Sequence, residues 1–155
     1  MIKRLAYEQT IPAPLNQVWN YFSTPMNLNS LTPPDMEFQI IEGGQKSMYQ
    51  GQLIEYRIQF LPQLKSRWLT EITHIKEQTY FIDEQRMGPY QFWHHQHHFE
   101  QIKSGTRMTD LVTYKLPFGL IGDLVHKIWI GPRLKVIFDY RARQVDMIFG
   151  KAQDI

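Results

Sequence analysis

A change of hydrophobic period late in the chain constrains the fold more than any other feature of the sequence. From Met36 to Leu116 apolar side chains recur mostly at every second residue, which is typical of strands with one buried face. Beyond Gly119 they recur at three- and four-residue steps as far as Phe149, which indicates a long amphipathic helix. A run of strands followed by one long helix predicts an α+β domain in which a curved antiparallel sheet wraps around that helix.

Turn-forming residues divide the alternating region into segments whose connections are short, which favours antiparallel pairing. The turns are expected at Gly43-Gly44, Leu61-Pro62, Lys76-Glu77-Gln78, Gly88-Pro89 and Ser104-Gly105. The predicted strands are Glu37–Glu42, Ser47–Phe60, Lys65–Ile75, Thr79–Arg86, Gln91–Ile102 and Thr106–Leu116. Together with an alternating N-terminal segment, Ile2–Ile11, they make a sheet of six or seven strands. Residues 1–155 contain no repeat or linker and are expected to form one domain.

Two short helices are expected between the first strand and the rest of the sheet. Pro12-Ala13-Pro14 ends that strand and can begin a helix, because proline is tolerated in the first helical turn. The apolar face of this helix consists of Leu15, Val18, Trp19 and Phe22. A second helical segment lies between Pro25 and Pro33. The apolar stripe of the C-terminal helix is Leu124, Ile128, Leu134, Ile137, Phe138, Val145, Ile148 and Phe149, with an early kink or break expected at Gly131-Pro132.

Composition excludes several classes of function. The net charge is +2, and the 17 basic and 15 acidic residues are scattered, whereas a nucleic-acid groove needs clustered basic residues. The absence of cysteine rules out disulfides, thiolate nucleophiles and cysteine-ligated zinc. No apolar run reaches the length of a membrane span, and the N-terminal residues alternate instead of forming a signal peptide. We therefore expect a cytoplasmic protein without stable membrane insertion, and the sequence leaves open whether it forms a homodimer.

Four of the six histidines lie in one predicted strand, within the run Trp93-His94-His95-Gln96-His97-His98-Phe99. Side chains alternate between the two faces of a strand, so His95 and His97 share a face with Trp93 and Phe99. The aromatic residues mark this face as the concave, buried one. The other two histidines of the run are expected to face solvent.

The register that keeps both strand faces consistent also predicts partners for these histidines. A tight turn at Ser104 places His97 opposite Asp110. In the same register Phe99, His95 and Trp93 lie opposite Met108, Val112 and Tyr114. Across the Gly88-Pro89 hairpin, Asp83 or Glu84 should lie near His95.

Three interpretations of the buried histidines stay open. They can form a purely structural network with carboxylate and tyrosine partners, since buried polar groups need hydrogen bonds. They can anchor the polar end of a ligand in an otherwise apolar pocket. They can also act as an acid–base pair or, with a carboxylate across the strands, ligate zinc. No third histidine is placed to complete a metal site, so the sequence predicts no metal and no cofactor.

Recognisable residues are spread over nearly the whole chain: Val18-Trp19, Phe22, Pro25, Leu28, Leu31-Thr32-Pro33-Pro34, Arg67-Trp68, Asp83-Glu84-Gln85, Gly88-Pro89-Tyr90, Trp93-x-His95-x-His97-x-Phe99, Asp110, Tyr114-x-Leu116-Pro117-Phe118-Gly119 and Phe138-Asp139-Tyr140-Arg141. With the predicted order of elements, this set resembles a bacterial ligand-binding subgroup of the SRPBCC superfamily. That superfamily has the helix-grip fold and includes START lipid-transfer domains, the birch-pollen allergen and polyketide cyclases. The resemblance carries no catalytic role, because the superfamily shares no catalytic motif.

The predicted function is the binding or carrying of an apolar small molecule, of lipid, polyketide, isoprenoid or aromatic type, between the sheet and the C-terminal helix. The alternative is a cyclase- or dehydratase-like enzyme whose acid–base groups are His95, His97, Asp110 and Tyr114. The lack of a serine elbow, a glycine-rich phosphate loop and a Walker-type lysine favours the binder. Arg141 lies beside the apolar stripe, where it can reach the sheet or extend to water. The candidate pocket residues are Trp68, Asp83, Trp93, His95, His97, Phe99, Asp110, Tyr114, Phe138 and Arg141.

Overall fold

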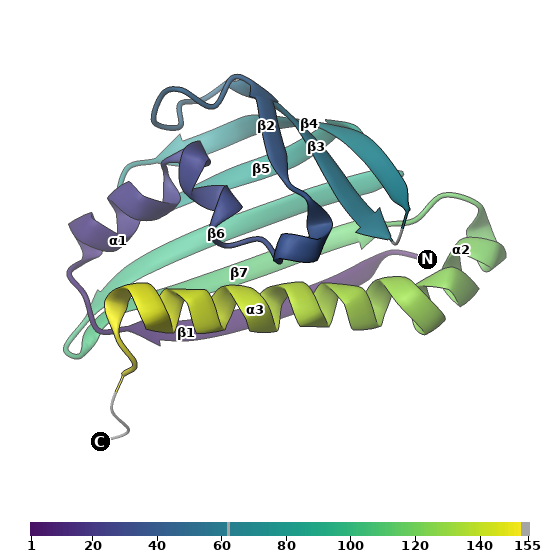
Figure 1. The fold of residues 1–155 in the computed structure, drawn as a ribbon. Coiled ribbons are helices and arrows are strands. Elements are labelled where there is room, and N and C mark those ends of the chain that lie inside the picture. Colours follow the sequence, from purple (N-terminus) through teal and green to yellow (C-terminus); the bar gives the residue numbers. More distant parts are fainter. Residues whose placement is uncertain (62, 153–155) are drawn as a thin grey trace.

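A computed structural model describes residues 1–61 and 63–152, and Figure 1 shows their arrangement. In this part of the chain seven strands form one antiparallel sheet in the order β1-β7-β6-β5-β4-β3-β2. The strands are β1 (Lys3–Ile11), β2 (Gln39–Glu42), β3 (Leu53–Leu61), β4 (Leu64–Lys76), β5 (Tyr80–Met87), β6 (Phe92–Ile102) and β7 (Gly105–Lys115). The predicted α+β helix-grip class is confirmed. Pro62 of the predicted Leu61-Pro62 turn lies outside the described residues.

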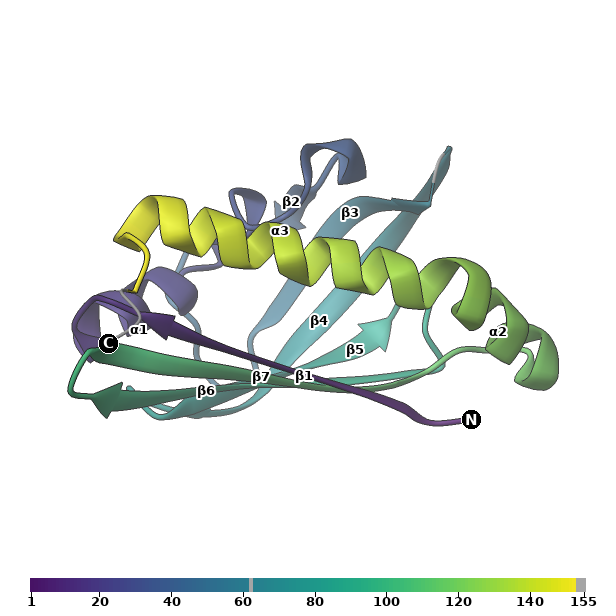
Figure 2. The same cartoon turned by 90° about the horizontal axis from the view of Figure 1, so that it is seen from below.

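The helices lie on the concave face of the sheet, as Figure 2 shows from below. After β1 come α1 (Leu15–Phe22) and two short 3-10 helices, η1 (Pro25–Asn29) and η2 (Pro34–Met36). After β7 come α2 (Gly119–Val125), a π-helical turn η3 (His126–Ile130) and α3 (Gly131–Phe149). The long helix α3 runs along the sheet from the α2 end to the α1 end (Figures 1 and 2).

Two clusters of buried apolar side chains hold the helices against the sheet. Cluster A consists of Met36, Ile58, Trp68, Tyr90, Trp93, Val112, Tyr114, Ile130, Leu134 and Phe138. Cluster B, around α1, consists of Ile11, Ala13, Val18, Trp19, Phe22, Leu31, Phe81, Phe99, Met108 and Val145. Full burial of each large apolar side chain contributes about 1.5–3 kcal/mol, so both ends of α3 are anchored. Leu134 and Phe138 anchor one end, and Val145 anchors the other.

The predicted strand beginning at Ser47 is wrong in its first part, because β3 begins only at Leu53. Gln52 is buried, and its side chain bonds to main-chain groups of the preceding segment. Its amide donates to the Gly43 carbonyl at 2.8 Å, and its carbonyl accepts from the Tyr49 N–H at 3.1 Å. Gly51 has a φ of +82°, which turns the chain just before Gln52. These side-chain bonds compete with strand pairing, and an alternating sequence does not reveal them.

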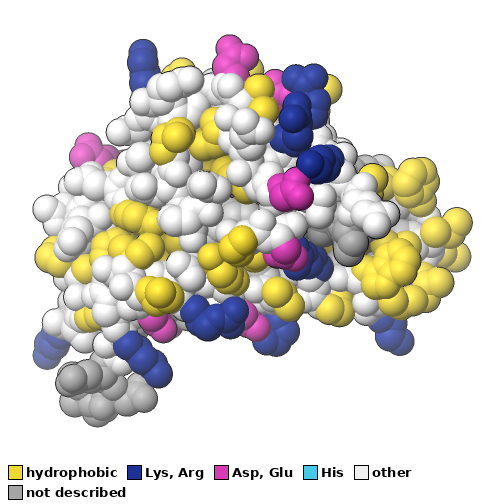
Figure 3. Space-filling model, in the orientation of Figure 1, with side chains coloured by type: hydrophobic (Ala, Val, Ile, Leu, Met, Phe, Trp, Pro, Cys, Tyr) yellow, Lys and Arg dark blue, Asp and Glu magenta, His cyan; other side chains and the backbone are white. Residues whose placement is uncertain are grey.

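The C-terminal helix does not break at Gly131-Pro132 but passes through the π turn directly before it. A wider turn accommodates a proline ring that would clash with an ordinary α-helical turn. It also changes the phase of the helix relative to α3, so that Leu124 before the turn and Ile128 within it are 58% and 56% exposed instead of joining the buried stripe. Figure 3 shows an apolar surface at this end, to which Phe118, Leu120, Ile121 and Trp129 contribute. None of the helices in residues 1–61 and 63–152 is both long and apolar enough to cross a membrane.

The start of β7 depends on glycine at position 105. Gly105 has a φ of +133°, and a Cβ added there would lie 2.1 Å from the Ile11 carbonyl oxygen. We expect Gly105→Ala to lower the free energy of unfolding by more than about 2 kcal/mol, since strain and a main-chain clash add up. Gly51→Ala is the matched control, because its Cβ meets nothing within 4 Å and only the strain of about 1–2 kcal/mol remains. Urea denaturation measures the free energy of unfolding of both variants. Equal losses of stability would contradict the close approach of Gly105 to the Ile11 carbonyl.

Candidate functional site

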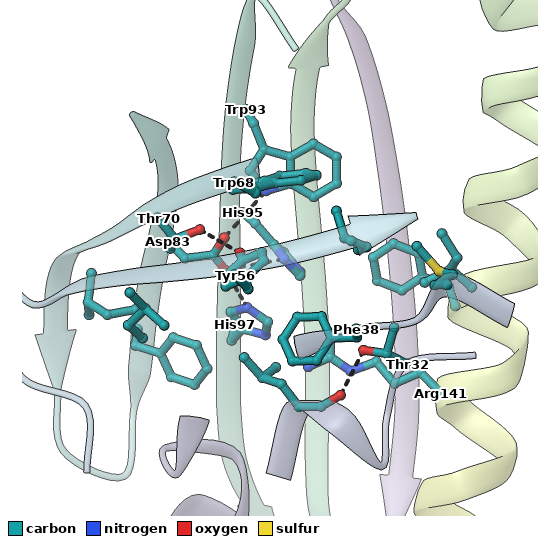
Figure 4. Close-up of a pocket in the computed structure, with 18 of the residues that line it drawn as sticks. Thr32, Phe38, Tyr56, Trp68, Thr70, Asp83, Trp93, His95, His97 and Arg141 are labelled. Atoms are coloured by element: carbon teal, nitrogen blue, oxygen red, sulfur yellow. Dashed lines mark hydrogen bonds and ion pairs between the residues drawn. The ribbon is translucent and has the colours of Figure 1, made fainter. Parts of the chain in front are cut away.

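A cavity of about 150 Å³ lies between the concave sheet face, the loops after α1 and the middle of α3 (Figure 4). Its walls are mostly apolar and include Met36, Phe38, Ile54, Trp68, Leu134 and Phe138. The polar side chains of its wall include Asp83, His95 and His97 from the sheet and Arg141 from α3. Ligand pockets commonly combine an apolar wall with a few convergent polar groups in this way.

Seven of the ten residues predicted for the pocket line this cavity: Trp68, Asp83, Trp93, His95, His97, Phe138 and Arg141. Phe99 does not, because α1 covers it and its ring packs 5.4 Å from that of Trp19. Tyr114 does not either, since it is fully buried in cluster A and its hydroxyl is 2.6 Å from His126 Nε2. Asp110 lies behind the two histidines and lines a smaller cavity of about 50 Å³.

Several wall residues were missed by the sequence-based prediction, although a signal for them exists. Ile54, Tyr56 and Ile58 recur at every second residue of β3 and all line the cavity. On β4, Thr70 and Ile72 share the face of Trp68 in the same way. The Tyr56 hydroxyl is 2.5 Å from Thr70 Oγ1, so this polar pair is satisfied across the two strands. Extending the period of two to β3 and β4 would have found these positions.

The predicted register around the histidines is confirmed. His97 lies opposite Asp110 in the β6–β7 ladder, and the pairs Phe99–Met108, His95–Val112 and Trp93–Tyr114 follow as predicted. Across β5–β6, Asp83 lies opposite His95. Glu84 lies on the other face, where its carboxylate is 2.7 Å from His94 Nδ1.

Two histidines and two aspartates form a buried cluster across β5, β6 and β7. Asp83 Oδ2 is 3.3 Å from His95 Nδ1 and 2.8 Å from His97 Nε2. On the other side of the rings, Asp110 Oδ1 is 3.1 Å from His95 Nε2 and 2.8 Å from His97 Nδ1. The last contact has the distance of an ion pair without the alignment of a hydrogen bond. Trp93 Nε1 donates to the second oxygen of Asp83 at 3.3 Å. Each imidazole therefore lies between two carboxylates.

Burial and neighbouring charges move the pKa values of the two histidines in opposite directions. Burial and the charge of His97 lower the pKa of His95 more than the carboxylates raise it. Burial also disfavours the charged form of His97, but Asp110 and Asp83 together raise its pKa above the ordinary value.

The carboxylates of the cluster stay ionised. Burial alone would raise the pKa of Asp83, but His95, His97 and Trp93 lower it overall. Burial likewise opposes ionisation of Asp110, but Arg141 and the histidines hold its pKa well below the ordinary value. The negative charges of the two aspartates are thus stabilised by the neighbouring imidazoles and, for Asp110, by Arg141.

Arg141 brings its positive charge to the cavity from α3, opposite the sheet (Figure 4). Its guanidinium carbon lies 5.3 Å from the centre of the Phe22 ring. Within residues 1–61 and 63–152, Arg141 Nε and Nη2 are buried and have no hydrogen-bond partner, and the same holds for Trp68 Nε1. A buried donor without a partner costs about 1–3 kcal/mol. Two residues of the cavity wall, Arg141 and Trp68, therefore hold hydrogen-bond donors that the described protein atoms do not satisfy.

Asp83, His95 and His97 also have an arrangement that suits a metal ion. One carboxylate oxygen and one nitrogen from each ring lie within 4.8 Å of one another. The prediction of no metal rested on the lack of cysteine and of a third well-placed histidine. In the structure, the third donor is a carboxylate from the neighbouring strand.

Residues 11–141 match the model of a family described as polyketide cyclase/dehydrase and lipid transport. No curated protein matches the sequence significantly.

Solved structures with the same fold include protein CV1439 from Chromobacterium violaceum, which is 11% identical with a TM-score of 0.70 over 95% of this chain and 97% of that one. The protein TTHA0849 from Thermus thermophilus is 18% identical with a TM-score of 0.64, over 94% and 99% of the two chains. Major latex-like protein 151 from Panax ginseng is 12% identical with a TM-score of 0.70, over 96% and 97%. By the extent of the family match, the chain belongs to the polyketide cyclase/dehydrase and lipid transport family, which is of SRPBCC type.

Proposed function

We propose that this chain binds a small, largely apolar molecule with an anionic or hydrogen-bond-accepting end in the cavity between the sheet and α3. The observation that carries the proposal is an apolar cavity at whose wall Arg141 and Trp68 hold buried donors without a protein partner. The family description, which includes lipid transport, supports a carrier of apolar ligands.

The size of the cavity favours an occupant of about one ring. A dry apolar cavity of roughly 150 Å³ accommodates one benzene molecule, whereas pockets for drug-sized ligands are about 300–1,000 Å³. A monocyclic aromatic ligand or a short-chain ligand therefore fits the measured volume of about 150 Å³ without rearrangement. A long acyl chain would require movement of the wall, for which Met36 and Met48 are the most adaptable side chains.

The polar end of the ligand is expected to face Arg141. A guanidinium presents several donors in a planar fork that matches a carboxylate, and its charge strengthens each hydrogen bond. The aspartates lie on the sheet side of the cavity wall, so an anion is repelled there and attracted toward α3. The ligand's ring then lies against the apolar wall, near Trp68 and Trp93.

A second function, acid–base catalysis of a cyclase or dehydratase kind, is supported by one specific observation. The rings of His95 and His97 lie 3.8 Å apart at the cavity wall, and their pKa values are moved in opposite directions. In such a pair one group holds its proton more readily than the other, which suits an acid and a base acting together. Tyr114 lies outside the cavity, so this alternative depends on the two histidines with Asp83 and Asp110.

The ligand-binding proposal predicts a preference for anionic ring compounds. We expect a monocyclic aromatic carboxylate to bind at least about tenfold more tightly than the corresponding uncharged amide, which is about 1.4 kcal/mol. Arg141→Gln should remove this preference. Arg143→Gln, an exposed position on the same helix, is the matched control and should keep it. Calorimetry together with Trp fluorescence measures the affinity of each protein for the carboxylate and for the amide. The proposal fails if the wild type binds neither compound, or if Arg141→Gln keeps the preference.

The opposite pKa shifts predict opposite pH dependences for the two histidines. Folding raises the pKa of His97, so its stabilisation is complete below the unfolded pKa of about 6.5 and is lost as pH rises through the folded pKa. The stability advantage of the wild type over His97→Gln is therefore larger near pH 6 than near pH 9. For His95→Gln the trend reverses, because folding lowers that pKa. Urea denaturation measures the stability differences at each pH, and NMR titration in the presence of chelator measures the pKa values of the two histidine rings. A His95 ring more basic than that of His97 would contradict it.

A further inference from the structure

The geometry points to a metal site in the cavity wall, in which Asp83, His95 and His97 bind one divalent transition-metal ion and Asp110 and Trp93 orient these ligands. The site shares the cavity of the proposed function but does not require that an organic ligand binds there. We infer it from three features of the cluster: the spacing of the inner donors, the partners behind them and the balance of charge.

The spacing of the inner donors matches a metal-ligand set. Two ligands each about 2.1 Å from a metal at tetrahedral or octahedral angles lie roughly 3.0–3.4 Å apart. Asp83 Oδ2 is 3.3 Å from His95 Nδ1 and 2.8 Å from His97 Nε2. One carboxylate oxygen of Asp83 and one nitrogen from each of the two rings lie within 4.8 Å of one another. A metal ion can therefore be accepted with small movements of three side chains held on adjacent strands.

The partners behind the donors are those of a metal centre. A histidine that binds a metal almost always gives its other ring N–H to a carboxylate, carbonyl or water. The two nitrogens that a metal would leave free both face Asp110 Oδ1: His95 Nε2 is hydrogen-bonded to it at 3.1 Å, and His97 Nδ1 lies 2.8 Å from it as an ion pair without hydrogen-bond alignment. Trp93 Nε1 holds the second oxygen of Asp83. By contrast, among the described residues His94 on the outer face of β6 contacts one carboxylate, that of Glu84.

Charge and donor type define the class of metal. Two aspartates balance a dication, and two imidazoles with one carboxylate suit Zn²⁺, Fe²⁺, Co²⁺ or Ni²⁺ better than Mg²⁺ or Ca²⁺. Three protein donors leave at least one coordination position, as in metal sites that bind an exchangeable ligand. Asp83, His95 and His97 all line the cavity, so this position is open to an occupant of the cavity.

The test is titration of chelator-treated, full-length protein with Zn²⁺ alone and with Co²⁺ alone. We expect one ion per chain with a Kd below about 1 µM near pH 7.5, and no binding of Mg²⁺ or Ca²⁺ in that range. Asp83→Asn and His95→Gln should weaken Zn²⁺ binding more than about 100-fold, and Asp110→Asn about 10- to 100-fold. His94→Gln and Glu84→Gln, a histidine–carboxylate pair on the outer face of the same strands, should leave it unchanged.

A measurement without variants keeps the test decisive if a substitution prevents folding. Co²⁺ should shift and broaden the ring signals of His95 and His97 most strongly in the wild type, and the ring signals of His94 and His98, which lie on the outer face of the sheet, much less. Binding weaker than about 100 µM, or an effect of His94→Gln as large as that of His95→Gln, would overturn the site. Binding of the aromatic carboxylate to chelator-treated protein is measured in parallel. If the aromatic carboxylate binds but Zn²⁺ does not, only the metal site is refuted. If Zn²⁺ binds but the aromatic carboxylate does not, only the proposed function is refuted.

Discussion

Two aspartates enclose two imidazoles across three neighbouring strands, and the rest of the structure depends on this contact. The His97 ring stacks 4.1 Å from Phe81 of cluster B, and the His95 ring lies 5.8 Å from Phe138 of cluster A. The side chains of His97 and Asp110 are only 4% and 8% exposed. Removing such groups from water costs several kcal/mol per charge, which is offset only when every charge has a partner. Because a one-residue slip of β6 would move both histidines to the outer face, the cluster specifies the register of the sheet.

The same arrangement explains why α3 does not close completely onto the sheet. Large apolar side chains of α3 pack into cluster A near its start, and Val145 packs into cluster B near its end. Between them α3 presents Arg141, while the sheet presents Asp83, His95 and His97. Direct contact of these polar side chains with the opposite apolar surface would leave buried charges unpaired. A cavity with one polar wall is therefore a consequence of placing charged residues in the middle of an otherwise apolar interface.

The sequence predicted the register of this cluster but not the limits of the cavity. Alternation places Trp93 and Phe99 on the buried face, and the tight turn at Ser104 then sets the pairing, so the position of Asp110 opposite His97 followed from the two together. Alternation does not say which helix covers a given stretch of a strand, and for this reason Phe99 was assigned to the pocket although α1 covers it. The π turn before Pro132 and the side-chain hydrogen bonds of Gln52 to the preceding segment are local features that a periodic pattern does not encode.

The proposed metal site and the anionic end of the proposed ligand would be linked by charge. Two carboxylates balance a dication held by neutral imidazoles, and Arg141 then leaves one positive charge at the cavity wall. In a buried site an unbalanced charge is costly, and an anionic group coordinated to the metal and facing Arg141 would restore neutrality. Each partner should therefore increase the affinity for the other, and by thermodynamic linkage by the same factor. An uncharged ring compound gains nothing from this balance, so the coupling would select anions even where the apolar contacts with Trp68 and Trp93 are equal.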